Sequence, residues 1–178
     1  MLRRTAPAVA AGAAGVAVAA VALWPGTARA DSAPAPHDVV WLTSTAAGDL
    51  FEIEGAQTAE THAHSTAVKA LGARLAADHI KSASDLLRFA ALMDVHLPTE
   101  PDPKDSAELS RLALLHGTAF DKEYLKTEIS HHKKAISAAR KEIAAHGNTE
   151  IVEEARRDLP VLRAHLRLAE QTQSRIGR

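Results

Sequence analysis

The 178-residue chain contains no cysteine, and only 3% of its residues are aromatic. Without thiols it can form neither disulfides nor thiolate metal sites, so a metal would have to be held by histidine, carboxylate or water. The chain also lacks a Gly-x-Ser-x-Gly elbow and a glycine-rich phosphate loop. Hydrolases and nucleotide-binding proteins of those types therefore find no support. Val and Ile occur mostly singly rather than in alternating runs, which argues against a sheet.

The first 30 residues have the composition of an export signal. Arg3 and Arg4 precede a stretch over residues 8–24 made almost only of Ala, Val, Gly and Leu, and residues 28–30 read Ala-Arg-Ala. A charged start, a short apolar run and small residues at a cleavage site are typical of a signal peptide. The run is shorter than the ~20 residues of a membrane span and is weakly hydrophobic. We expect cleavage after Ala30, no stable membrane span afterwards, and export to the extracellular or cell-envelope space.

Removal of that segment changes the charge of the chain. Three of the 21 basic residues and none of the 22 acidic residues lie in 1–30, so the remaining 148 residues carry 18 basic and 22 acidic side chains. This net charge of −4 argues against a nucleic-acid partner. The length suits one domain, and the abundance of Ala, Leu, Glu, Lys and Arg favours helix. We predict an all-α domain over residues 38–178 after a disordered Pro/Ala/Ser tether over 31–37.

Apolar residues at steps of three and four predict four long helices. The first covers about residues 37–61, the second begins at a Ser65 or Thr66 cap, the third covers about 119–145, and the fourth follows an Asn148 cap. A short helix over about 105–115 lies in the crossover between the second and third. The helix stop signals are Pro98, Pro101, Pro103 and Gly147. Two short links and one longer crossover predict a ferritin-like four-helix bundle with this extra short helix.

Three histidines on three different predicted helices fall on or beside the apolar stripes. His79 and His132 lie at stripe centres, whereas His165 lies on a flank, just over one turn after Pro160. Pro160 predicts a kink, which is either a tolerated bend or a device that shapes a pocket beside His165. Burial of an imidazole without a partner costs roughly 1–3 kcal/mol. These positions therefore require hydrogen-bond partners, a metal or water.

A carboxylate on the first helix would complete a three- or four-ligand set for Cu, Zn or Fe. Glu54 is nearer than Glu52 to the apolar stripe expected there, so Glu54 is the preferred candidate. The second-tier candidates are Glu52, Asp78, Glu128 and His131. Residues 128–131 form a Glu-x-x-His motif, but a di-iron bundle needs this motif twice, and it occurs here once.

Runs in all four long helices resemble the bacterial family called domain of unknown function 4142 (DUF4142), over about residues 38–172. The resemblance implies an exported ferritin-like bundle, often labelled an outer membrane protein, without a demonstrated activity. It places the recurring histidines of the family on His79, His132 and His165, and its first-helix acids on Glu52 and Glu54. Residues 120–136 are also similar to the related domain of unknown function 305 (DUF305), members of which are linked to copper handling. The runs that carry the first resemblance are residues 52–54, 68–72, 78–79, 120–132 and 159–160 with His165.

Three functions follow as hypotheses. The first is an exported helical bundle that binds or buffers a transition metal through its core histidines without catalysis. The second is a structural or stress-related envelope protein whose histidines satisfy only each other or backbone groups. The third is a ferritin-like redox enzyme, which the single Glu-x-x-His disfavours. Ligands that each lie about 2.0–2.1 Å from one metal must converge within ~5 Å of one another, so geometry distinguishes the first hypothesis from the second.

Overall fold

The structure is a computed structural model that describes residues 33–177. Its helices are α1 (Pro36–His62), α2 (Thr66–Met93), α3 (Pro103–Leu112), α4 (Gly117–Ala145) and α5 (Thr149–Ile176). No strand forms in this part of the chain, where an isolated bridge pairs Ala63 with Gly117. The all-α prediction is therefore confirmed. The expected signal peptide and the first two tether residues lie outside the described residues. Pro36 and His37, which the sequence pattern places in the tether, belong to α1.

Two long helices begin at the caps that the sequence predicts. The Ser65 hydroxyl accepts a hydrogen bond from the backbone N–H of Ala67 at the start of α2. The Asn148 side chain accepts two from the first turn of α5. Both caps satisfy N–H groups that a helix start leaves without partners.

The end of α4 differs from the prediction, because the left-handed residue is His146, with φ 53°, rather than Gly147. Gly147 is needed for a different reason. A Cβ on Gly147 would lie 2.7 Å from the side-chain carbon Cγ of Asp38, so only glycine fits there without a shift. The Asp38 carboxylate accepts hydrogen bonds from the backbone N–H of Asn148 and thereby links the starts of α1 and α5.

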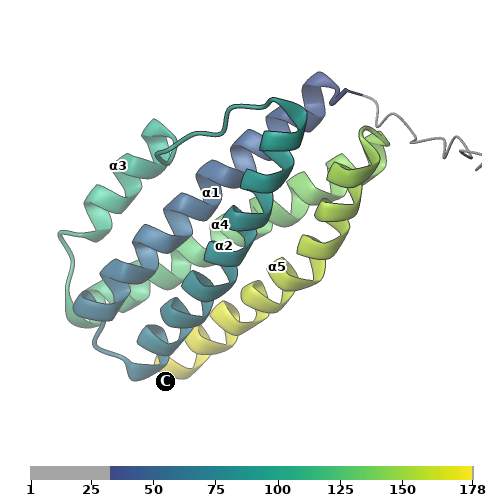
Figure 1. Cartoon of the computed structure of the whole chain (residues 1–178). Helices are drawn as coiled ribbons and strands as arrows, with labels where there is room; N and C mark the ends of the chain where they lie inside the picture. Colours follow the sequence, from purple (N-terminus) through teal and green to yellow (C-terminus); the bar gives the residue numbers. More distant parts are fainter. Residues whose placement is uncertain (1–32, 178) are drawn as a thin grey trace, which may run out of the picture. The chain divides into compact units, whose positions relative to one another are not determined.

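The four long helices form two antiparallel hairpins, α1 with α2 and α4 with α5, which pack against each other (Figure 1). The long crossover between the hairpins contains α3, which packs on α1 and α4. This connectivity, with one long crossover, is that of a ferritin-like four-helix bundle. None of the helices in residues 33–177 has the length and apolarity that crossing a membrane requires.

The apolar core is divided into two clusters by a layer of ionisable side chains. Along α1, Leu42 belongs to one cluster and Ala59 to the other, and the buried acids Asp49 and Glu52 lie between them. The first cluster includes Leu71, Leu75, Phe120, Tyr124 and Leu125, and the second includes Trp41, Leu42, Leu86, Ile151 and Ala155. The buried acids of this layer thus lie between two apolar clusters, where buried polar groups need hydrogen-bond partners.

Candidate metal centre

The three histidines singled out in the sequence converge in this layer of ionisable side chains. His79 from α2, His132 from α4 and His165 from α5 are 7%, 1% and 2% exposed. One ring nitrogen from each lies within 4.8 Å of the other two. Their ring centroids are 5.3 to 5.7 Å apart. His165 therefore faces inward with the other two, and Pro160 lies within α5, which continues past it to Ile176.

Each of the three rings uses one nitrogen to bond a group that lies away from the other two rings. These hydrogen bonds join His79 Nδ1 to Asp49 Oδ1 at 2.8 Å, His132 Nδ1 to the Glu128 carbonyl at 2.9 Å, and His165 Nε2 to Asp78 Oδ2 at 2.8 Å. Carbonyls and carboxylates only accept, so these ring nitrogens carry the protons. In a neutral imidazole the other nitrogen is then a bare lone pair, the form in which histidine binds metals.

The inner nitrogens of the three rings face one another. His132 Nε2 lies 3.2 Å from His165 Nδ1, and His79 Nε2 is buried with no hydrogen-bond partner. Protonation of one of these two rings would turn the contact between their lone pairs into a hydrogen bond, but burial opposes protonation. Burial, and then the nearby His79, lowers the pKa of His132 to about 3, and burial also lowers the pKa of His165. His132 and His165 therefore present two neutral nitrogen donors to each other, with His79 Nε2 buried beside them.

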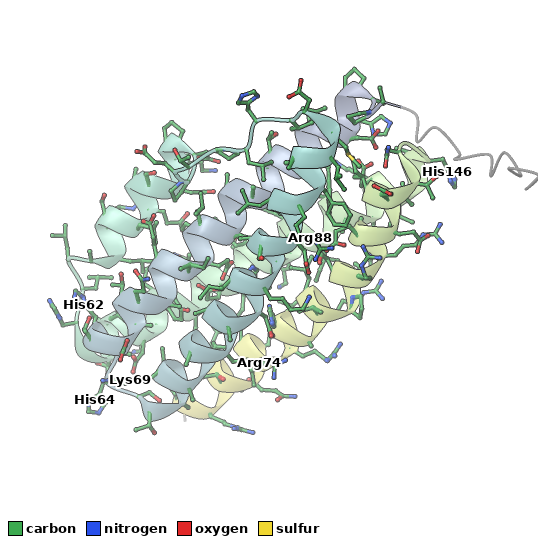
Figure 2. All side chains as sticks on the ribbon, in the orientation of Figure 1. His62, His64, Lys69, Arg74, Arg88 and His146 are labelled. Atoms are coloured by element: carbon green, nitrogen blue, oxygen red, sulfur yellow. The ribbon has the colours of Figure 1, made fainter. Side chains whose placement is uncertain are left out.

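The outer partner of His165 is itself held in the ionised form. Burial opposes ionisation of Asp78, but hydrogen bonds from His165 and Arg74 outweigh it and lower the pKa of this carboxyl. Arg74 Nε lies 2.6 Å from Asp78 Oδ2, and its side chain is on the exposed side of α2 (Figure 2). A chain of contacts thus runs from the surface to the histidine cluster.

A cavity of about 550 Å³ reaches the histidine cluster between the two hairpins. Its lining comes from all four long helices and from the start of α3. It includes exposed residues such as Lys81 on α2 and Arg157 on α5, and also all three histidines. The volume is in the range of small-ligand pockets, so an ion has a route to the buried nitrogens.

The first-helix acid at this site is Glu52, and the preference for Glu54 is corrected. Glu54 is exposed, whereas Glu52 is 4% exposed, and its Oε2 lies 4.0 Å from His79 Nε2. The buried face of α1 includes Asp49 and Glu52 as well as apolar residues. Acids occupy two positions of that buried face. The hydrophobic pattern alone therefore places the predicted buried face of α1 toward Ile53 and away from Glu52.

Among the second-tier residues, Glu128 is fully buried and faces Glu52. Burial is the main cause that raises the pKa of both carboxyls, and for Glu52 the nearby Glu128 adds to the effect. The hydroxyl of Tyr124, one turn before Glu128, is buried without a hydrogen-bond partner. These three side chains form a group of oxygen donors next to the histidine cluster, which we call the carboxyl pair with its tyrosine.

His131 lies outside the histidine cluster, although it follows Glu128 in the Glu-x-x-His motif. Its Nε2 lies 3.2 Å from Glu108 Oε2 and 3.7 Å from Asp105 Oδ1, both on α3. Its ring stacks on Phe51 with centroids 4.1 Å apart. The two ligand types of the motif therefore belong to different clusters, and the motif does not build a di-iron half-site here.

Sequence reasoning missed Asp49, the hydrogen-bond partner of His79. The pattern in the sequence that could have identified Asp49 is its spacing of three residues from Glu52, which puts both acids on one helix face. Asp158 lines the cavity, and burial followed by the charge of Glu154 raises its pKa to about 7.

Comparisons with known proteins agree with this fold. Residues 25–172 match the family described as "Domain of unknown function (DUF4142)". No curated protein matches the chain. A similar solved structure is the crystal structure of a DUF305 fragment from Deinococcus radiodurans, with a TM-score of 0.72, 15% identity, and coverage of 80% of this chain and 98% of that one. The structural likeness shows a shared fold. The family match covers most of the length of this chain, so the chain belongs to the DUF4142 family.

Proposed function

We propose that this protein binds one transition-metal ion through His79, His132 and His165, and that it sequesters or buffers that ion. The observation that carries the proposal is the 3.2 Å approach of His132 Nε2 to His165 Nδ1. Two lone pairs at this distance repel unless a cation lies near both, and His79 Nε2 supplies a third donor. A metal ion replaces this repulsion with three ligand bonds.

The donor set indicates the class of metal. Neutral imidazoles suit Cu, Zn and Fe, and the chain has no thiolate to offer. Hydrogen bonds from the outer ring nitrogens to Asp49, Asp78 and the Glu128 carbonyl fix each ring and increase its basicity, as they do around established histidine metal sites. Glu52 is placed to supply an oxygen as a further ligand.

The proposed role is binding rather than redox catalysis. Ferritin-type chemistry uses two Glu-x-x-His motifs whose members point to one centre. Here the single motif is divided, because Glu128 faces Glu52 while His131 pairs with Glu108 on α3. This division supports a mononuclear histidine site as the functional centre.

We also propose that the protein works outside the cytoplasm. The support is the sequence of residues 1–30, with its charged start, apolar run and Ala-Arg-Ala ending. N-terminal sequencing of the protein recovered from cell-envelope and culture fractions tests this. A protein that begins at Asp31 supports export, and a protein found only in the cytoplasm with residues 1–30 intact contradicts it.

Calorimetric titration with Zn²⁺ and Cu²⁺ tests the metal proposal. We expect one high-affinity ion per chain, loss of that binding in a His79→Ala/His132→Ala/His165→Ala variant, and unchanged binding in His64→Ala. His64 is exposed and lies away from the cluster, near the end of the bundle (Figure 2). If the triple variant is folded by circular dichroism and still binds with wild-type stoichiometry and affinity, the proposal fails and the histidines have a structural role.

A further inference from the structure

We propose a second cation site in this protein, built only from oxygen atoms, at the carboxyl pair with its tyrosine. Four oxygen atoms there are buried without a hydrogen-bond partner: Glu52 Oε2, Glu128 Oε1, Glu128 Oε2 and the Tyr124 hydroxyl. Glu52 is 4% exposed, and Glu128 and Tyr124 are fully buried. The inference goes beyond the proposed function and does not depend on it.

The number of unpartnered atoms is the first reason to infer a cation. Each buried polar group without a partner destabilises the fold, and more so when it is charged. A proton shared between Glu52 and Glu128, together with donation by the Tyr124 hydroxyl to Glu128, would satisfy only part of this group. A divalent cation contacts several oxygens at once and neutralises both carboxylates.

The geometry brings these oxygens to one place. An oxygen from each of Glu52 and Glu128 and a nitrogen of His132 lie within 4.8 Å of one another. Tyr124 and Glu128 are four residues apart on α4, so they share a face and point toward Glu52 on α1. The absence of a side chain at Gly55 leaves space beside them, because a Cβ there would lie 3.9 Å from Glu128 Oε1 and 3.6 Å from Tyr124 Cε2.

His132 orients this group but does not ligate the second ion. Its Nδ1 carries a proton and donates to the Glu128 carbonyl. The same Nδ1 lies 3.6 Å from Glu52 Oε1 and 3.6 Å from Glu128 Oε2. This nitrogen thus lies beside both carboxyl groups, while the Nε2 of the same ring faces the histidine cluster. One ring thus serves both sites through different nitrogens.

The donor atoms determine which ion the second site prefers. Carboxylate and hydroxyl oxygens suit harder ions such as Mg²⁺, Ca²⁺ and Mn²⁺, whereas three imidazoles suit Zn and Cu. Glu52 lines the cavity, which gives an ion access. Its Oε2 also lies 4.0 Å from His79 Nε2, so it stands between the two sites. The layer of ionisable side chains would then hold a hard divalent cation beside the imidazole-bound ion.

Titration of the full chain with Mn²⁺, followed by the electron paramagnetic resonance signal of free Mn²⁺, tests the inference. We expect the wild type to bind one Mn²⁺ and Glu128→Gln, which keeps the side-chain size, to bind it at least about tenfold more weakly. The matched control is Glu123→Gln, on the same helix, whose carboxylate is half exposed and pairs with Lys126. That control should bind Mn²⁺ as the wild type does.

Two further variants separate this site from the histidine site. The His79→Ala/His165→Ala variant, which keeps His132 beside the carboxyl pair, should still bind Mn²⁺, so failure of the proposed zinc or copper site would leave the Mn²⁺ result standing. Tyr124→Phe, which removes only the hydroxyl, should weaken Mn²⁺ binding a few-fold, and it provides the test if Glu128→Gln does not fold. The inference is overturned if the wild type binds no Mn²⁺, or if folded Glu128→Gln or Tyr124→Phe binds it with unchanged affinity.

Discussion

His132 Nε2 and His165 Nδ1 lie 3.2 Å apart in the bundle core, and the other nitrogen of each ring donates a hydrogen bond outward. Two neutral imidazoles so arranged direct lone pairs at each other. A hydrogen bond between the rings would require one of them to be charged, and burial opposes this charge by lowering the pKa of both. The relationship distinguishes this cluster from ordinary buried histidines, in which each ring finds a donor and an acceptor.

Glu52→Gln should weaken Zn²⁺ binding, whereas Glu54→Gln should leave it unchanged. Glu52 is buried beside His79, and its negative charge stabilises a bound cation, whereas Glu54, two residues later, faces solvent. We expect a loss of at least about tenfold in affinity for Glu52→Gln by calorimetry. Equal affinities for the two variants would contradict the assignment of Glu52 to the site.

Asp78→Asn should reduce Zn²⁺ affinity by about 10–100-fold, because Asp78 accepts the hydrogen bond that orients His165. Asp85→Asn is the matched control two turns further along α2, where the carboxylate pairs with Lys81 and Arg88 at the surface. Its affinity should stay within about twofold of the wild type, since surface ion pairs contribute little. A similar loss in both variants would indicate a general charge effect.

His132 should remain neutral in the metal-free protein at pH 5. Its folded-state pKa is about 3, below the value of 6.5 expected in the unfolded chain. Between pH 6.5 and 3 the unfolded chain therefore takes up a proton that the folded chain does not, so this residue's contribution to the free energy of unfolding falls as pH falls. The slope is at most about 1.4 kcal/mol per pH unit.

Nitrogen-15 NMR of the imidazole rings measures this directly. The His132 ring should show the neutral form with its proton on Nδ1, where it donates to the Glu128 carbonyl. A His132 ring that titrates near pH 6.5 would contradict the buried, metal-ready state.

Gly48→Ala should stabilise the protein by about 0.5–1 kcal/mol, because alanine favours helix and a Cβ at Gly48 meets nothing within 4 Å. Gly72→Ala should lose this gain and destabilise by about 1–3 kcal/mol, because its Cβ would lie 3.2 Å from Ala59 Cβ and 3.5 Å from the Ala56 backbone. Urea unfolding of the two variants measures both effects. Stabilisation by both would mean that α1 and α2 are free to separate at Gly72.

Most of the fold could be predicted from the sequence because its determinants are local. The Ser65 and Asn148 caps set helix starts through hydrogen bonds within a few residues, and Pro103 stands at the start of α3. The end of α2 differs, because the helix ends at Met93, with Asp94 left-handed, before the prolines are reached. The apolar stripe of α2 identified its buried face, and His79 was correctly placed on it. The link lengths then favoured antiparallel hairpins.

The site was harder to predict because it depends on the rotation of helices about their axes. The burial of Asp49 and Glu52 makes the inner face of α1 partly polar, so the hydrophobic pattern located that face incorrectly. The pairing of His131 with Glu108 depends on where α3 docks, which the sequence of the crossover does not encode locally. The orientation of His165 likewise requires the contact between α2 and α5.

X-ray absorption of the full chain loaded with one equivalent of Zn²⁺ tests the histidine site most directly. The structure predicts nearest-neighbour nitrogen or oxygen ligands at about 2.0–2.1 Å and the outer-shell scattering of three imidazoles. The His79→Ala/His132→Ala/His165→Ala variant should lose that scattering. A wild-type spectrum with one imidazole or none would contradict the account, because the zinc would then be bound elsewhere than at His79, His132 and His165.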